Sequence, residues 1–337
     1  MGGKPLVSVC VITYNHISYI EKCLDSILAQ HASFEIEILV HDDASTDGTI
    51  EILQKYENKY PGIFRVFYEK ENQYQKDTYP GGYTQGLLVP SARGEYIAAC
   101  EGDDYWADVN KLQKQVDYLQ SHPECALVCH AAVVVDGISD EKLCRMGMGD
   151  TEHDLSSEEI IANWNVPTAS WLYRKSLFVS KHIDWPATFP VGDFPSVLYA
   201  SATGRVHYFP DEMSVYRYQV PGSWTSSLNT DNKRVLNAKR WLEMYETIDQ
   251  FTGHRWHSSF IEASHPLLRT VFSSEAMPDL TVFVKEAINS LCFKDWSIVA
   301  VKRCLRFFGY AIEPKGFGKD EGRKLVRIAS RNNQMPR

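Results

Sequence analysis

The chain has 337 residues, of which 44% are hydrophobic and 23% are charged. This composition excludes disordered, collagen-like and low-complexity proteins, and the net charge of −8 argues against general nucleic-acid binding. The charge is unevenly spread, because residues 285–337 contain 12 Lys and Arg against 5 Asp and Glu. An acidic body is therefore followed by a basic tail.

The eight cysteines stand mostly in apolar segments, which indicates buried free thiols in a reducing compartment rather than a disulfide framework. No segment approaches the roughly 18 apolar residues of a membrane-spanning helix. The N-terminal segment becomes strand-like too early for a signal peptide. We therefore expect a cytoplasmic protein.

The first 135 residues alternate strand and helix patterns. Short apolar, β-branched runs predict strands at residues 6–13, 35–40, 63–68, 95–100 and 126–135. Residues 18–21 form a capping-box pattern that opens a helix, residues 49–60 show helical spacing, and a third helix follows Asp108 as its N-cap. This alternation predicts βαβ units and a largely parallel sheet, in which ligands bind at the carboxyl ends of the strands.

The pattern becomes mixed after residue 155. We expect a helix at 156–163, a strand at 168–173, a helix at 194–203 and short strands near 206–209 and 213–216. From about Thr230 onward the pattern is helical.

Acidic residues gather where two of the predicted strands end. The second strand runs into Asp42, Asp43 and Asp47, and the fourth into Asp103 and Asp104. Carboxylates in this position can hold a divalent cation or accept hydrogen bonds from a sugar or a base. The first cluster can equally cap the next helix, the reading we favour for Asp47. For Asp103 and Asp104 we favour a functional role, because adjacent carboxylates repel unless a cation or donors offset them.

Several familiar site motifs are missing from the sequence. No G-x-G-x-x-G follows the first strand, which argues against a dinucleotide-binding turn. The sequence also contains neither a G-x-x-x-x-G-K-[ST] phosphate loop nor a G-x-S-x-G nucleophile elbow.

Four ordered motifs resemble those of the family 2 glycosyltransferases. They are VSVCVITYN (7–15), LDSILAQ (24–30), DDASTDGT (42–49) and EGDDYW (101–106), the last followed by KLQKQ (111–115). The last two segments are similar to the branch that builds bacterial capsule and O-antigen repeat units. The resemblance covers about residues 5–220 and is specific, because all four motifs occur in order at compatible spacing.

The resemblance implies an α/β protein with the GT-A fold, which has a Rossmann-like, mostly parallel sheet, and here a helical C-terminal extension. Residues 1–228 would form the glycosyltransferase domain, with a nucleotide-sugar-binding half (1–135) and an acceptor-binding half (136–228). Residues 229–337 would form the helical, basic C-terminal region.

By the same resemblance, four residues would bind the nucleoside of the donor: Thr13, Tyr14, Asn15 and Asp43. The ring of Tyr14 would stack on the base, and the carboxylate of Asp43 would accept a hydrogen bond from it.

The resemblance also assigns the diphosphate side of the donor. Asp103 would sit near the ribose and help Asp104 to hold Mn²⁺ or Mg²⁺. Neutralising a diphosphate leaving group is chemistry that such a cation supplies as a Lewis acid. Arg217 would face the diphosphate, whereas Gln219 stands where the family commonly has a histidine.

The segment VGDFP (191–195) resembles the family segment that carries the catalytic base. Asp193 would take the proton from the acceptor hydroxyl as that oxygen attacks the anomeric carbon. An exposed Asp, with a pKa near about 3.9, is a weak base, so we expect desolvation or neighbouring carboxylates to raise its pKa. A role as N-cap of the helix at 194–203 is compatible with this function.

Two tryptophans are candidates for the acceptor site. Trp106 directly follows the acidic motif and offers a face on which a sugar can stack. Trp224 lies in a segment, 219–228, that we expect to form a loop closing over the bound donor.

The basic tail has two interpretations. Residues 296–308 are amphipathic at helical spacing, and a second basic helix is predicted to follow, with Lys319, Arg323, Lys324, Arg327 and Arg331. Residues 296–331 would then contact an anionic membrane at its inner face. The alternative is a solvated helical cap on the catalytic domain.

Together these observations predict an inverting, metal-dependent glycosyltransferase that uses a nucleotide sugar, expected to be a UDP-sugar. Its acceptor would be a glycan or lipid-linked glycan in bacterial surface polysaccharide synthesis, with no nucleic-acid partner. A nucleotidyltransferase is the second possibility, although no glycine-rich, basic phosphate loop follows the first strand. An inactive carbohydrate-binding protein is the third, and the joint presence of the four aspartates Asp43, Asp103, Asp104 and Asp193 argues against it.

Overall fold

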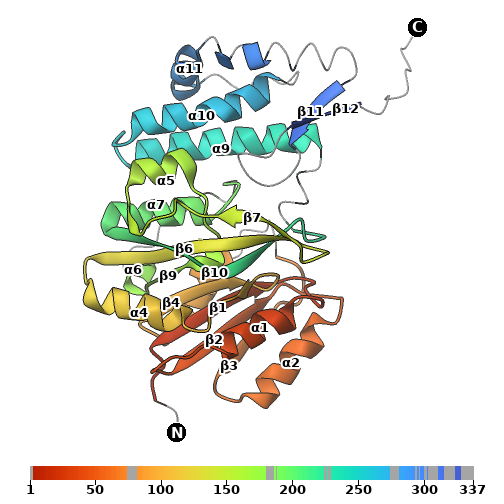
Figure 1. Cartoon of the computed structure of the whole chain (residues 1–337), viewed down its shortest axis with the longest axis vertical. Helices are drawn as coiled ribbons and strands as arrows, with labels where there is room; N and C mark the ends of the chain where they lie inside the picture. Colours follow the sequence, from red (N-terminus) through yellow and green to blue (C-terminus); the bar gives the residue numbers. More distant parts are fainter. Residues whose placement is uncertain are drawn as a thin grey trace. The chain divides into compact units, whose positions relative to one another are not determined.

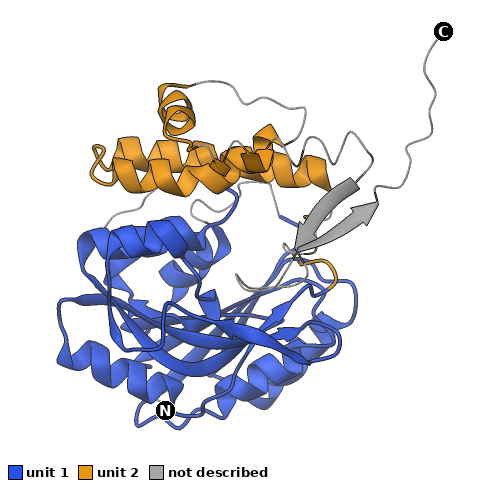
Figure 2. Cartoon of the chain, turned by 45° about the horizontal axis from the view of Figure 1, so that its top comes forward, with its two compact units in different colours: residues 1–220 blue, residues 221–337 orange. Residues whose placement is uncertain are grey.

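The computed structural model describes residues 3–73, 82–179, 186, 188–223, 226, 228, 230–273, 281–292, 294–295, 297–299 and 302, and the backbone of 310–314 and 323–327. The chain divides into two compact units, residues 1–220 and 221–337 (Figure 2).

In the described part of the first unit, ten strands form one sheet in the order β3-β2-β1-β4-β9-β6-β10-β5, with β7 paired to β6 and β8 to β10. The strands are β1 (Val7–Thr13), β2 (Ile36–Asp42), β3 (Phe64–Tyr68), β4 (Tyr96–Glu101), β5 (Tyr105–Trp106), β6 (Cys125–Asp136), β7 (Lys142–Met146), β8 (His153–Leu155), β9 (Leu172–Arg174) and β10 (Arg205–Tyr218). The five strands predicted in the first 135 residues are β1, β2, β3, β4 and β6, and all five are confirmed.

The strands β1 to β4 run parallel, and β1 lies between β2 and β4. Both faces of such a sheet are covered in its middle, which is why β1 and β4 are almost continuously buried rather than alternating. Thr13 at the end of β1 pairs with Asp42 at the end of β2, and Ile12 pairs with Glu101 at the end of β4. The register therefore brings the carboxyl ends of three strands to one edge.

The sheet of the first unit is flanked by helices. They are α1 (Ile20–Leu28), α2 (Thr49–Lys59), α3 (Val89–Ser91), α4 (Lys111–Ser121), α5 (Ser157–Asn163), α6 (Ser176–Val179) and α7 (Asp193–Thr203), with a π-helical turn at Thr84–Leu88 and a 3₁₀ turn at Thr168–Ser170. Figure 1 shows α1 and α2 beside β1, β2 and β3. The helix α1 buries Ile20, Leu24 and Ile27 in the core, because these residues recur at helical spacing.

Several local predictions differ from the structure. The capping box at 18–21 does not form, because α1 begins at Ile20 after Tyr19 and its first N–H groups donate to the carbonyl of His16. The helix α4 begins after Asn110, whose N–H donates to the carboxylate of Asp108 at 2.8 Å. The two short strands near 206–216 are one strand, β10, interrupted only by irregular register.

A buried polar network ties the amino ends of β1, β2 and β4 together. Glu37 accepts hydrogen bonds from the hydroxyl of Ser8 at 2.6 Å and from Nε of Arg93 at 2.7 Å. The hydroxyl of Ser8 in turn accepts from the N–H of Gly94 at 2.8 Å. Burial would raise the pKa of Glu37, but the hydrogen bonds from Ser8 and Arg93 outweigh it and lower that pKa. The charged carboxylate is thus part of the fold.

The second unit contains α9 (Asp231–Phe251), α10 (His257–Phe272) and α11 (Val282–Asn289). The rings of Tyr245 and Phe260 lie 5.4 Å apart where α9 packs on α10. Nowhere in the described ranges is there a helix both long and apolar enough to cross a bilayer.

The predicted second basic helix is wrong for the part of it that the structure describes. Residues Arg323–Arg327 form β12, which pairs antiparallel with β11 (Tyr310–Pro314). The prediction depended on the spacing of charges, which does not supply the apolar stripe that a helix buries, whereas adjacent Leu325 and Val326 suit a strand. Most of the predicted membrane-contacting segment, 296–331, lies outside the described residues.

Gly94 lies so close to the backbone of β1 that a larger residue there should destabilise the protein. A Cβ at this position would lie 2.6 Å from the backbone nitrogen of Ser8, so Gly94→Ala forces backbone atoms apart. We expect its free energy of unfolding to fall by about 1–3 kcal/mol, measured by urea denaturation. Gly3→Ala is the control, because its Cβ would meet nothing within 4 Å. Equal stability of the two variants would contradict the tight contact.

Candidate functional site

The loops that follow β2 and β4 are fastened to the end of β1. The N–H of Asp43 donates to the carbonyl of Thr13 at 3.0 Å, and the N–H of Gly102 donates to the carbonyl of Ile12 at 2.8 Å. These bonds extend the parallel ladder by one residue beyond the strands. The loops that carry the two acidic motifs therefore both begin beside the end of β1.

Asp43 is buried and already holds two partners. Its Oδ1 accepts from the N–H of Gln73 at 2.7 Å, and its Oδ2 accepts from the hydroxyl of Tyr83 at 3.2 Å. A carboxylate has about four acceptor positions, so Asp43 retains capacity for a further donor such as a base.

The other two aspartates of the first acidic motif act within the fold. Asp42 is fully buried and accepts from the N–H and the hydroxyl of Ser45, at 2.9 and 2.5 Å. Asp47 accepts from the N–H of Thr49, the first residue of α2, at 3.0 Å and from the N–H of Ile17 at 2.9 Å. These contacts agree with the capping role favoured for Asp47.

Tyr14 and Asn15 lie in the turn directly after β1. The side chain of Tyr14 is 43% exposed and has a free aromatic surface. Asn15 adopts the left-handed backbone conformation, with φ of 54°, and its side-chain oxygen accepts from the N–H of Thr46 at 2.8 Å. Its own N–H donates to the hydroxyl of Ser45 at 2.8 Å. Asn15 therefore joins the β1 turn to the β2 loop, leaving Tyr14 at the surface.

His16 connects the β1 turn to the second acidic motif, a contact that the sequence did not predict. Its Nδ1 lies 3.2 Å from the hydroxyl of Thr13, and its Nε2 lies 3.9 Å from Oδ2 of Asp103. Gly102 makes this approach possible, because a Cβ there would lie 2.8 Å from Oγ1 of Thr13 and 2.9 Å from Nδ1 of His16. The only sequence signal was the position of His16 beside the first motif.

The second acidic motif places three carboxylates in one short turn. Asp104 is 1% exposed, and its Oδ1 accepts from the N–H of Arg217 at 2.9 Å. Burial and the charges of Asp103 and Glu101 raise the pKa of Asp104. Burial and the charges of Asp103 and Asp193 raise the pKa of Glu101 to about 7. Sequence reasoning missed Glu101, although it begins the EGDDYW motif.

This turn has the donor set of a hard divalent cation. Oε2 of Glu101 is buried and has no hydrogen-bond partner among the described residues. The charged side chains of the turn, Glu101, Asp103 and Asp104, are all carboxylates. Oxygen-only donors with excess negative charge suit Mg²⁺ or Mn²⁺. The donor types of this turn therefore suit the cation that the resemblance implies.

Arg217 on β10 contacts the acidic turn at residues 101–104 and helps to hold it in place. Its guanidinium donates to the backbone carbonyl of Asp103 and, through Nε, to Oδ1 of Asp140 at 3.1 Å. The same group lies 4.7 Å from the ring centre of Tyr105 and 5.1 Å from that of Tyr19. Because Arg217 is only 4% exposed, its charge is committed to these protein groups, and the contact with the diphosphate stays a prediction.

Asp193 begins α7 and belongs to the same charged region. Its Oδ1 accepts from the N–H of Phe194 at 2.7 Å. Burial raises the pKa of Asp193, and the indole of Trp164 opposes that rise without reaching hydrogen-bond geometry. Asp193 lies close enough to Glu101 for its charge to raise the pKa of Glu101. The two residues are 92 positions apart in the sequence, so this interaction depends on the fold.

Trp106 occupies the core rather than the surface. It is 4% exposed, its indole N–H donates to the carbonyl of Ala169 at 3.0 Å, and Nζ of Lys111 lies 4.1 Å from its ring centre. Burial lowers the pKa of Lys111 to about 7. These contacts favour a packing role, and no free face is left for a sugar.

The segment predicted to close over the donor follows β10. Gln219, at its start, has a left-handed backbone with φ of 61°. Trp224 lies outside the described residues, so its predicted acceptor contact stays a prediction.

Comparison with known proteins identifies the family of the chain. A family model described as glycosyl transferase family 2 matches residues 8–178. The uncharacterized protein Rv1520 of Mycobacterium tuberculosis is 32% identical over 272 residues, covering 79% of this chain and 75% of that protein.

Two solved structures are similar in fold. TarS 1–349 of Staphylococcus aureus in complex with UDP-GlcNAc matches with a TM-score of 0.56 and 20% identity, covering 96% of this chain and 99% of that chain. The mannosyltransferase PcManGT from Pyrobaculum calidifontis, in complex with GDP-Man and Mn²⁺, matches with a TM-score of 0.53 and 18% identity, covering 90% and 88%. The expected GT-A fold is confirmed, and the chain belongs to glycosyl transferase family 2.

Proposed function

We propose that this glycosyltransferase moves a sugar from a nucleotide-diphosphate sugar, a UDP-sugar, to a hydroxyl of a glycan or lipid-linked acceptor in bacterial surface polysaccharide synthesis. The observation that carries the proposal is the register of β1, β2 and β4, which brings the loops with Asp43, Asp103 and Asp104 to one edge of the sheet. The similar protein TarS is a poly(ribitol-phosphate) beta-N-acetylglucosaminyltransferase whose structure contains UDP-GlcNAc. What TarS acts on and binds supports a UDP-sugar as the donor and a polymer as the acceptor.

The donor would bind along the edge formed by the strand ends. The exposed ring of Tyr14 offers a face for the base, and Asp43 would accept a hydrogen bond from it. Thr13 and Asn15 would shape the turn beneath the nucleoside. A divalent cation held by Asp104 and Asp103 would neutralise charge on the diphosphate, as the Mn²⁺ in the PcManGT complex suggests.

Asp193 would act as the catalytic base. Its carboxylate takes the proton of the acceptor hydroxyl while that oxygen bonds to the anomeric carbon, and the bond from that carbon to the diphosphate oxygen breaks on the opposite face. One such in-line displacement inverts the anomeric configuration. The burial that raises the pKa of Asp193 makes its carboxylate a stronger base than an exposed Asp.

The direct experiment is a panel of UDP-, GDP- and dTDP-sugars incubated with the full chain and Mn²⁺. We expect slow release of UDP from one UDP-sugar, faster with a suitable acceptor. Release of pyrophosphate would instead support the nucleotidyltransferase alternative. If no nucleoside diphosphate is released from any donor, the proposal fails.

Asp193→Asn removes the base and keeps the shape of the side chain. We expect the transfer rate to fall by about 10²–10⁴-fold, while UDP affinity measured by calorimetry stays unchanged. Asp211→Asn is the matched control, because Asp211 is an exposed carboxylate on β10 that pairs with Lys114. Full transfer activity in the Asp193 variant would refute the assignment.

The pH dependence of transfer tests the same residue in a second way. A base works only when deprotonated, and the pKa of Asp193 is raised by burial. Activity should therefore be lost as pH falls through a midpoint above the ordinary value of about 3.9. The kcat/KM profile reports this acidic limb, which should disappear from the residual activity of Asp193→Asn. An identical limb in both proteins would assign it to another group.

Gly102→Ala tests the contact between the two motifs. The new Cβ would displace Thr13 and His16, so we expect UDP affinity to fall at least about tenfold, or about 1.4 kcal/mol. Gly94→Ala is the matched control, because Gly94 precedes the same strand at its opposite end. Calorimetry should show weaker UDP binding only for the Gly102 variant. Unchanged binding there would mean that the donor does not depend on this turn.

A further inference from the structure

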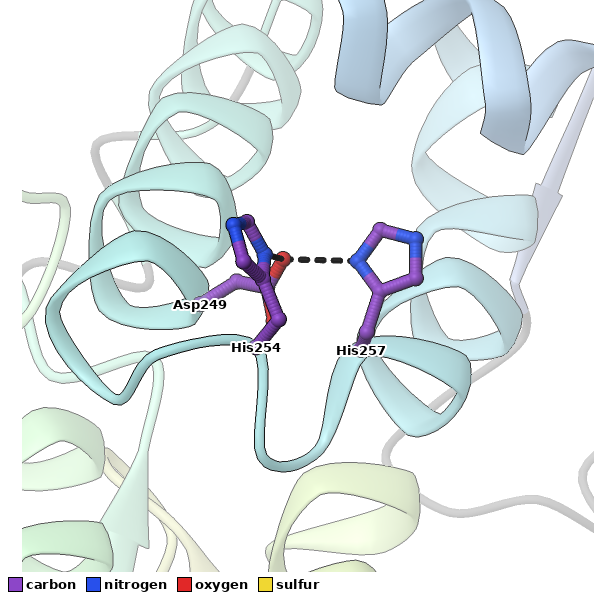
Figure 3. A group of neighbouring side chains, drawn as sticks. All are labelled: Asp249, His254 and His257. Atoms are coloured by element: carbon purple, nitrogen blue, oxygen red, sulfur yellow. Dashed lines mark hydrogen bonds and ion pairs between the residues drawn. The ribbon is translucent and has the colours of Figure 1, made fainter.

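A second group of ligating side chains belongs to the helical unit and includes none of the residues of the proposed function. Asp249 is near the end of α9, His254 is in the loop that follows, and His257 is the first residue of α10 (Figure 3). Nδ1 of His254 lies 2.8 Å and Nδ1 of His257 lies 2.7 Å from the same oxygen, Oδ2 of Asp249. All three ligand atoms lie within 4.8 Å of one another.

The backbone holds this arrangement in place. The N–H of His254 donates to the carbonyl of Asp249 at 2.8 Å, and His254 adopts a left-handed conformation with φ of 62°. Asp249 is 1% exposed, and its Oδ1 is buried with no hydrogen-bond partner among the described residues. A buried carboxylate with an unsatisfied oxygen needs compensation from positive charge.

The far nitrogen of His257 has a partner of its own. Nε2 of His257 lies 2.9 Å from Oε2 of Glu286 on α11. A carboxylate can only accept there, so Nε2 carries the proton, and in a neutral ring the lone pair of Nδ1 then faces Asp249. Two acceptors 2.7 Å apart require a second proton or a cation between them. A carboxylate that fixes the tautomer of a metal-binding histidine is a recurrent feature of zinc sites.

We propose that this group binds Zn²⁺ through Oδ2 of Asp249 and through Nδ1 of His254 and His257. Glu286 would orient the ring of His257 through its contact with Nε2. Two imidazole nitrogens and one carboxylate oxygen suit Zn²⁺, whereas the oxygen-only turn at Asp103 and Asp104 suits Mg²⁺ or Mn²⁺. In tetrahedral Zn²⁺ sites ligand atoms are about 3.3 Å apart, so the side chains open by about half an ångström to admit the ion. Water completes the coordination.

Zinc at this point would cross-link the helical unit. Its ligands come from the end of α9, the connecting loop and the start of α10, and Glu286 adds α11. Because the ion binds only when these segments are folded together, it stabilises the unit by mass action. This structural role is independent of the chemistry at Asp193.

The test is a Zn²⁺ titration of the untagged full chain by calorimetry, with thermal unfolding as a second readout. We expect one equivalent to bind and to raise Tm. His254→Asn and His257→Gln should each weaken binding at least about tenfold and abolish the rise in Tm. Asn is chosen at position 254 because it tolerates the left-handed backbone, and the exposed His254 carries little risk to folding.

Two controls separate this site from others. His265→Gln removes a histidine of the same helix that contacts Ser290 rather than Asp249, and it should bind Zn²⁺ like the wild type. Asp104→Asn should also keep Zn²⁺ binding while altering the donor site. No binding by the wild type, or equal affinity in the His254 and His257 variants, would overturn the proposal and leave a hydrogen-bonded Asp–His network.

Discussion

The parallel pairing of β1 with β2 on one side and β4 on the other is the constraint on which the site depends. It sets Thr13 against Asp42 and Ile12 against Glu101, so the loops that follow carry their acidic side chains to one edge. A shift of one residue would send every side chain of the strand to the opposite face. The buried network of Ser8, Glu37 and Arg93 at the amino ends helps to hold that register.

Placing several carboxylates at this edge has an electrostatic cost, and the groups that compensate it differ from one carboxylate to the next. Burial raises the pKa of Asp42 as well, but its carboxylate accepts hydrogen bonds from the N–H and the hydroxyl of Ser45 in its own loop and acts within the fold. Glu101 and Asp104 have raised pKa values, because burial and neighbouring carboxylates act in the same direction. The proposed site at Asp249 in the helical unit has two nitrogen ligands, whereas the acidic turn offers only oxygen ligands. This difference in ligand type would let one chain bind a different cation at each site.

Much of this could be predicted from the sequence, because apolar β-branched runs report the parallel strands and the acidic motifs stand at their ends. The rest depends on contacts between distant positions. Arg217 meets Asp140 across 77 positions, and Trp106 is buried against the carbonyl of Ala169; neither partner leaves a local pattern. Glu101 was overlooked because its raised pKa comes from burial, which the sequence does not show. The strand β12 was missed because the spacing of charges does not reveal which backbone segments pair.

The measurement that tests the central claim most directly is UDP binding by calorimetry with and without Mn²⁺, in the wild type and in Asp104→Asn. The site described above predicts one equivalent of UDP whose affinity rises with Mn²⁺ in the wild type and does not respond to Mn²⁺ in the variant. Equal, metal-independent affinity in both proteins would contradict a donor site built on the acidic turn after β4.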